Sequence, residues 1–88
     1  MLKRSLIINQ KDNVAVLLQP GEKGDTVRIG NEEIVLKEFV DFGHKVAIKD
    51  FKAEDVVYKY GEDIGYAMLD IPAGTWIHNH NMGCRRGK

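Results

Sequence analysis

Apolar residues along this chain come in short runs, rich in β-branched side chains, in which apolar and polar positions often alternate. Runs of this kind, bounded by Gly, Pro, Asn or Asp, are typical of β-strands. No stretch keeps a 3.6-residue apolar period over three turns, so we expect at most one or two helical turns, with residues 53–55 the candidate. The strands expected from the pattern cover residues 5–9, 13–19, 26–29, 32–39, 43–51, 56–60, 64–69 and 75–80.

Glycine-containing turns connect these runs. Gly30-Asn31 tolerates positive φ and separates two alternating runs, which predicts a hairpin over residues 26–39. The stretch "GED" at 61–63 predicts a second tight turn, and "PGEKGD" at 20–25 predicts a loop. The pattern therefore favours a mainly β domain made of short hairpins.

The sequence also repeats itself. "AIKDFKAEDVVYK" (47–59) aligns without gaps to "AMLDIPAGTWIHN" (67–79), so that Asp50 matches Asp70, and "EKGDTV" (22–27) echoes "PAGTWI" more weakly. Each unit is a strand, an Asp able to cap the turn through its own backbone, an apolar anchor, a tight turn and a second strand. Units this few cannot stack as a solenoid, so we predict interlocked hairpins. Chance similarity is the alternative, since Asp, Ala and Gly are common in turns.

Length and charge limit the range of functions. Eighty-eight residues, 43% hydrophobic and 30% charged, are typical of one folded domain. Lys+Arg and Asp+Glu both number 13, which gives no general affinity for nucleic acid or an acidic membrane. We expect one domain over residues 1–82 and a disordered basic tail over 83–88.

The single cysteine and the N-terminus predict a cytoplasmic location. Cys84 has no partner for an intramolecular disulfide, which fits a reducing compartment. The apolar run after Lys3-Arg4 is too short for a signal peptide or a membrane span.

The stretch "WIHNHNMG" (76–83) is the first candidate for chemistry. On a strand, His78 and His80 would lie on one face, at a spacing that lets two imidazole nitrogens reach one metal ion, and Asn81 could add an oxygen ligand or a hydrogen bond. Most metal sites need three or more protein ligands. The alternative is a polar stripe on an exposed strand, because two histidines at i, i+2 are not a specific motif.

Other polar residues give weaker signals. His44, next to a glycine, is the remaining histidine, while Lys59 and Tyr60 could bind a carboxylate or a polyol or be ordinary strand residues beside a turn. Trp76 is expected to anchor the core or an interface. We interpret four carboxylates as turn caps: Asp12, Asp50, Asp63 and Asp70.

Three segments together resemble a known family. "GHKVAIKDF", "YKYGEDIGYA" and "IPAGTWIHNHN" are similar, in order and spacing, to the SAF-type domain of altronate and galactarate dehydratases. They are similar also to the small subunits of related two-component lyases, including sulfolactate sulfo-lyase. The resemblance runs from "IINQKDNVAV" to Asn81. It implies a β-clip fold of short bent hairpins.

The resemblance also implies an activity. It indicates the small subunit of a lyase that catalyses β-elimination of water from a sugar acid, or of sulfite in the sulfo-lyase, together with a separate large catalytic subunit. That subunit would hold most of a divalent metal, expected to be iron. By resemblance, His44, His78 and His80 would be catalytic, with His78 and His80 also candidate metal ligands. The substrate-binding residues would be Lys45, Lys59, Tyr60 and Asn81.

Two other functions stay open at this point. SAF-type domains also occur in sialic-acid synthases, antifreeze proteins and pilus-assembly proteins, so a stand-alone carbohydrate- or anion-binding module is one alternative. A structural domain without a site is the other, although such a domain has no need of three polar clusters. Exposed strand edges would also favour a homo-oligomer.

Overall fold

Ten short strands form three sheets in the computed structural model, which describes residues 1–7 and 9–84. The strands pair as β1-β4-β5, β2-β3-β6-β9 and β7-β8-β10, all antiparallel except β1 with β4. Within these residues there is no helix, and so none that could cross a membrane; the mainly β prediction is confirmed. The strands are β1 (Leu2–Lys3), β2 (Ser5–Leu6), β3 (Val14–Leu17), β4 (Thr26–Ile29), β5 (Glu32–Val35), β6 (Lys45–Ala47), β7 (Val56–Lys59), β8 (Glu62–Ala67), β9 (Trp76–Ile77) and β10 (Met82–Gly83).

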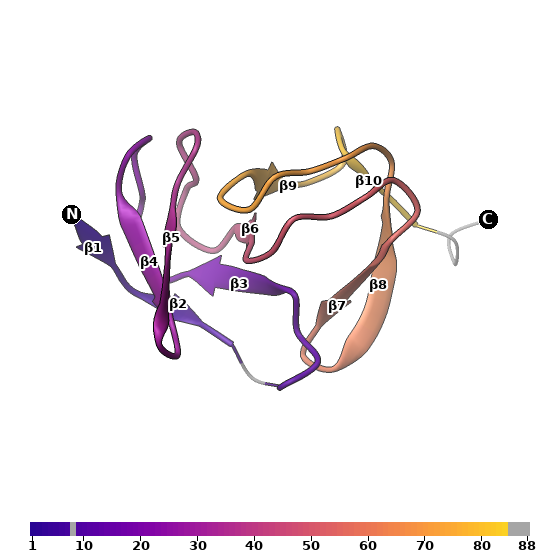
Figure 1. Ribbon diagram of the computed structural model, residues 1–88, viewed down its shortest axis with the longest axis horizontal. Coiled ribbons are helices and arrows are strands. Elements are labelled where there is room, and N and C mark those ends of the chain that lie inside the picture. The colour runs from indigo at the N-terminus through magenta and orange to yellow at the C-terminus, as the bar shows by residue number, and fades with distance from the viewer. Residues whose placement is uncertain (8, 85–88) are drawn as a thin grey trace.

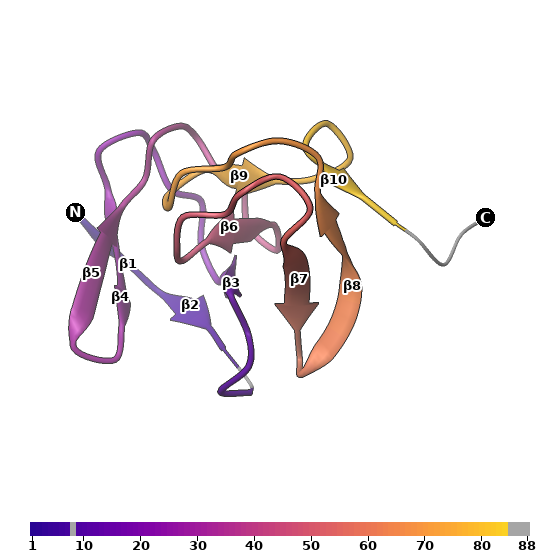
Figure 2. The ribbon, with the colours of Figure 1, turned by 45° about the vertical axis from the view of Figure 1, so that its right-hand side comes forward.

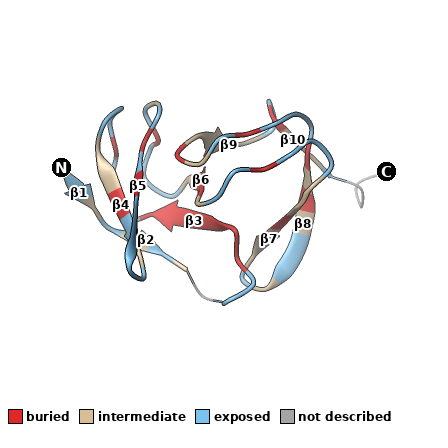
Figure 3. Cartoon of the chain, in the orientation of Figure 1, coloured by how far each residue is buried: buried red, intermediate tan, exposed pale blue. Residues whose placement is uncertain are grey.

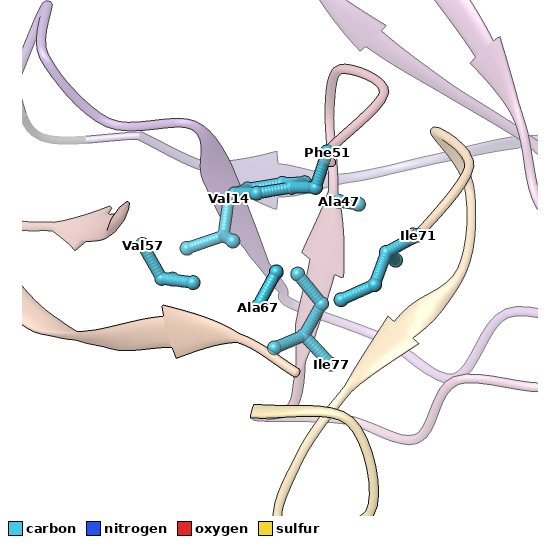
Figure 4. Close-up of a cluster of buried hydrophobic side chains, with 7 residues drawn as sticks. All are labelled: Val14, Ala47, Phe51, Val57, Ala67, Ile71 and Ile77. Atoms are coloured by element: carbon cyan, nitrogen blue, oxygen red, sulfur yellow. The ribbon is translucent and has the colours of Figure 1, made fainter. Parts of the chain in front are cut away.

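The central sheet, β2-β3-β6-β9, lies between the other two, which flank it on the left and right in Figure 1. Strand β3 is buried along its whole length (Figure 3), because Val14 on one face and Ala15 and Leu17 on the other enter two different cores. Towards β7 and β8 lies a cluster drawn in Figure 4, formed by Val14, Ala47, Phe51, Val57, Ala67, Ile71 and Ile77. Towards β4 lies a second cluster, formed by Ala15, Leu17, Val27, Leu36, Val40 and Val46.

The repeat in the sequence corresponds to two turns that cap each other. Asp50 Oδ1 accepts a hydrogen bond from Ala73 N at 2.9 Å, and Asp70 Oδ1 accepts one from Ala53 N at 2.9 Å. Each Asp therefore caps the turn of the other unit, not its own as the sequence pattern had suggested. Asp12 and Asp63 also accept backbone N–H bonds, so all four carboxylates act as caps.

The backbone of the two units is exchanged in the same reciprocal way. Phe51 and Ile71 bond each other in both directions, Phe51 N to Ile71 O at 2.7 Å and Ile71 N to Phe51 O at 2.9 Å. Gly74 N donates to Ala47 O at 2.8 Å, just as Glu54 N donates to Ala67 O at 2.7 Å. The segment between β6 and β7 runs next to the segment between β8 and β9 in Figure 2, and the predicted interlocking is confirmed.

Several sequence-based boundaries differ from the structure: the strands predicted over 32–39 and 43–51 are shortened to β5 and β6, and three further differences change the type or place of an element. The turn between β7 and β8 is Tyr60-Gly61, with φ of 57° and 78°, and not residues 61–63, because a two-residue hairpin turn needs two residues at positive φ. Residues 53–55 form a turn with Glu54 at φ 81°, not a helical turn. The last predicted strand, 75–80, ends at Ile77, and the chain turns before β10.

The first two residues of the predicted disordered tail lie in the described part of the chain. Gly83, in β10, pairs with Tyr66 of β8, and Cys84 is exposed. Residues 85–88, which make up the rest of the predicted tail, lie outside the described part of the chain.

Candidate functional site

Pairing of β6 with β9 brings His44 and His78 together. Val46 lies opposite Trp76 and Lys45 opposite Ile77, so His44, just before β6, comes to lie beside His78, just after β9. The two imidazole rings are 5.7 Å apart between centroids, and both side chains are half-buried. This register, set by the two short strands, joins residues that are far apart in the sequence.

Trp76 is the centre of the imidazole cluster, which we define as His44, Trp76, His78 and His80. The His78 ring is stacked on the indole at 5.3 Å with 10° between the planes. The His80 ring is 4.9 Å away at 42°, and the His44 ring 5.5 Å away at 64°. All three histidines of the chain therefore contact one tryptophan, although the strand that was to align His78 and His80 is absent.

A hydrogen bond from Trp76 determines the state of His44. The indole Nε1–H donates to His44 Nδ1 at 3.1 Å. Indole nitrogen can only donate, so Nδ1 must be unprotonated. The proton of the neutral ring then resides on Nε2, which is a hydrogen-bond donor.

Asn81 holds the loop that carries the other two histidines. Its side chain is buried, Oδ1 accepts from His78 N at 3.0 Å, and Nδ2 donates to Trp76 O at 2.9 Å. Met82 N also donates to His78 O at 2.9 Å, closing the turn. Both polar atoms of the Asn81 side chain thus bond to the backbone of β9 and of the loop after it.

A cavity of about 190 Å³ lies against the cluster, lined by Phe39, Asp41, His44 and Trp76. Phe39 and neighbouring Phe42 are exposed by 48% and 63%. The wall of this site is therefore partly apolar, and it carries one carboxylate and one imidazole.

A second hollow of about 310 Å³ lies on the His80 side of the same loop and includes Glu38 and Asn81. Glu38 Oε2 accepts a hydrogen bond from Trp76 N at 3.1 Å, which ties this wall to β9. His80, the exposed member of the cluster, belongs to this second wall.

Three of the residues predicted to bind substrate lie away from the cluster. Because side chains alternate along a strand, Lys45 lies on the opposite face of β6 from His44, opposite Ile77 of the first core. Burial, and then the charge of Lys59, lower the pKa of Lys45 below its ordinary value. Tyr60 occupies the tip of the β7–β8 hairpin, with the Lys59 ammonium 5.0 Å from its ring. That tip is at the opposite end of the molecule from the loop before β10 in Figures 1 and 2.

Comparison with known proteins identifies the family. The model of the altronate/galactarate dehydratase SAF domain matches residues 3–85. The chain belongs to this family. Altronate dehydratase of Escherichia coli is 43% identical over 74 residues, which cover 84% of this chain and 15% of that protein. The Bacillus subtilis altronate dehydratase is 36% identical over 80 residues, 91% of this chain and 16% of that protein.

A third relative is matched over most of its own length. The (2R)-sulfolactate sulfo-lyase subunit alpha of Paracoccus pantotrophus is 43% identical over 53 residues, which cover 60% of this SAF domain and 79% of that subunit. By contrast, the SAF domain spans only 15% and 16% of the two altronate dehydratases. The resemblance read from the three sequence segments is confirmed at the level of the family.

The described side chains of the SAF domain that could bind the predicted metal do not form a complete ligand set. Among residues 1–7 and 9–84, no group of three or more His, Cys, Asp or Glu side chains is placed to hold a metal ion. His44 does not suit a metal either, since Nδ1 is occupied by the indole and Nε2 carries the proton. These residues do not fit a metal centre held by this chain, and a shared one involving His78 and His80 stays a prediction.

Two features of the site were missed from the sequence. Trp76 packs against the second core cluster, as predicted, but its contact with all three histidines of the SAF domain was not predicted. Its spacing of two and four residues from His78 and His80 was the available signal. Glu38 and Asp41 lie close to His44 but far from Trp76 in sequence, and the fold brings them to Trp76.

Proposed function

We propose that this SAF domain is the small component of a lyase that eliminates water from a sugar acid, acting with a separate large catalytic subunit. The observation that carries the proposal is the family match over residues 3–85, whose relatives include altronate dehydratases. The imidazole cluster, beside a cavity and not buried in a core, supplies groups suited to this chemistry. We place the enzyme in the cytoplasm as part of the same proposal.

The reaction needs three groups around the substrate. A base takes the proton α to the carboxylate, an acid gives a proton to the departing β-hydroxyl so that it leaves as water, and a donor stabilises the charge on the enediolate oxygens. The enol that results becomes a 2-oxo-3-deoxy acid. An imidazole can both accept and donate a proton, so His78 and His80 suit the proton transfers.

The lysines and Tyr60 take a different place in the proposal. Lys45, Lys59 and Tyr60 do not share the cavity of the cluster, so a substrate-binding role would require a second contact surface with the large subunit. Exposed Phe39 and Phe42 next to the cavity provide apolar area that such a partner would cover. We propose that the substrate lies between the imidazole cluster and the partner.

A second candidate is the small subunit of a sulfolactate sulfo-lyase, in which sulfite leaves in place of water. The observation in its favour is the coverage of 79% of the Paracoccus pantotrophus subunit alpha at 43% identity. The name of that relative marks it as one part of a multi-subunit enzyme. The same imidazoles would serve either leaving group, so the substrate must be decided by assay.

Co-purification followed by assay tests the proposal. The tagged chain is expressed in its native host, the captured proteins are identified, and the complex is supplied with altronate, galactarate and (2R)-sulfolactate. Elimination is measured as 2-oxo acid or sulfite formed. We expect a large dehydratase-like partner, and a fall in kcat of about 10²–10⁴-fold in His78→Ala or His80→Ala.

Asn79→Ala is the matched control, because Asn79 is exposed between the two histidines. It should leave kcat unchanged. A complex whose activity survives loss of both His78 and His80 would contradict the proposed catalytic role. A chain that captures no partner but binds a sugar acid by itself would be a binding module and not an enzyme subunit.

A further inference from the structure

We infer that Trp76 is a positioning residue that keeps His44 as the neutral Nε2–H tautomer, so that His44 serves as a hydrogen-bond donor to an anionic oxygen and not as a base, an imidazolium or a metal ligand. The tautomer follows from the structure alone. Its meaning for catalysis rests on the proposed function.

Both partners of the indole–imidazole hydrogen bond are anchored from several sides. The backbone of Trp76 donates from N to Glu38 Oε2 at 3.1 Å and accepts at O from Asn81 Nδ2 at 2.9 Å. His44 N donates to Asp41 O at 3.2 Å, and His44 O accepts from Leu17 N at 3.0 Å. These bonds hold the backbone from which each ring extends, and in this arrangement the indole and the imidazole meet in the 3.1 Å hydrogen bond.

Chemistry then restricts what His44 can do. An imidazolium donates from both nitrogens, and a ring protonated on Nδ1 would direct a donor at the indole N–H, so either state breaks the bond. While the bond holds, Nε2–H is the polar group that His44 has left for a ligand. A neutral imidazole fixed in this way polarises an oxygen without transferring its proton, as a preorganised donor does at a developing oxyanion.

This assignment gives His44 a different role from His78 and His80. His44 would stabilise the carboxylate or enediolate oxygens, and the proton transfers fall to His78 and His80, whose rings contact the carbon surface of the indole. Trp76 itself need not touch the substrate. Its effect would be exerted through the orientation and the tautomer of His44.

Nitrogen NMR of the 88-residue chain tests the tautomer directly. In a ¹⁵N-labelled sample, long-range ¹H–¹⁵N spectra distinguish Nδ1–H, Nε2–H and imidazolium rings, and His44→Gln assigns the His44 signals. We expect a single Nε2–H pattern for the neutral His44 ring. We also expect a scalar coupling across the hydrogen bond between Trp76 Nε1 and His44 Nδ1, which needs no variant.

Trp76→Phe provides the perturbation, since it keeps an aromatic ring and removes the N–H. The single tautomer pattern of His44 should give way to the averaged pattern of a free imidazole, while the dispersed amide signals of β6 and β9 remain. An Nδ1–H or imidazolium pattern in the wild-type chain, or absence of the cross-bond coupling, would overturn the inference.

Activity then separates this inference from the proposed function. In the active complex, His44→Ala should lower kcat by about 10²–10³-fold, as loss of an oxyanion donor does, and Trp76→Phe should lower it by less. A chain with the expected NMR pattern but no elimination activity refutes the proposed function and leaves the tautomer assignment intact. Full activity in His44→Ala refutes the donor role.

Discussion

Replacing Asn81 by alanine distinguishes a residue that builds the site from one that binds substrate. The sequence and the family resemblance predicted that Asn81 contacts the substrate. In the structure its amide is 4% exposed, and both polar atoms are used within the loop that carries His78 and His80. Asn81→Ala is therefore expected to destabilise the isolated chain, with no ligand present.

The magnitude follows from the two bonds that are lost. Each contributes about 1 kcal/mol net, and a buried donor or acceptor left without a partner costs about 1–3 kcal/mol. The amide of His78 and the carbonyl of Trp76 both lose their side-chain partner, so we expect a loss of about 2–4 kcal/mol. In a domain of this size, each 1 kcal/mol lowers Tm by about 4–8 °C.

Urea unfolding of the isolated chain, followed by Trp76 fluorescence, measures the effect. Asn79→Ala is the matched control in the same loop and should change the free energy of unfolding by less than about 0.5 kcal/mol. An Asn81→Ala chain as stable as the wild type would refute the structural role. If that chain also lost affinity for a sugar acid in the complex, the substrate-binding prediction would be the correct one.

Two further substitutions test other parts of the structure. Lys45→Met should raise the free energy of unfolding at neutral pH, because burial and Lys59 disfavour the ammonium and lower the pKa of Lys45 in the folded state. The loss of stability caused by the Lys45 charge is complete below the folded-state pKa and disappears as pH rises towards the unfolded-state pKa of about 10.4. The increase in the free energy of unfolding in Lys45→Met, measured with urea, should therefore shrink over that range. An increase that does not change with pH would contradict this explanation. Gly74→Ala should cost more stability than Gly24→Ala in thermal unfolding. Both glycines have nearly equal φ (92° and 94°), but a Cβ at Gly74 would clash with Val35 O, whereas one at Gly24 meets nothing within 4 Å. Equal losses would mean that backbone strain alone, about 1 kcal/mol, sets the cost.

Alternation of apolar and polar residues was enough to find most strands, because one face of each hairpin must be buried. The prediction of strands failed where a side-chain hydrogen bond or a turn interrupts the pairing of strands. A strand was predicted over "TWIHNH", but the buried Asn81 side chain accepts a hydrogen bond from His78 N and the chain bends after Ile77. The turn at Tyr60-Gly61 was misplaced because it puts a tyrosine at positive φ, which propensity does not predict.

The members of the site were predictable as residue types but not as a group. All three histidines were singled out from the sequence, and the register of β6 with β9 determined that they meet at Trp76. The same register places Lys45 on the other face of the sheet, and the β7–β8 hairpin carries Tyr60 to a distant tip. Pairing of strands distant in sequence is information that a pattern within single segments does not contain.

The reciprocal capping of the two repeated turns has a consequence for cooperativity. Opening of the turn around Ala53 would release the Asp70 carboxylate, and opening of the turn around Ala73 would release Asp50, so disorder in either turn frees a capping side chain of the other unit. Strand β9 begins directly after the second turn and leads into the loop of His78 and His80. The segment before that loop is therefore hydrogen-bonded to a turn some twenty residues earlier in the chain, so a substitution in the earlier turn removes contacts of the segment that leads to these two imidazoles.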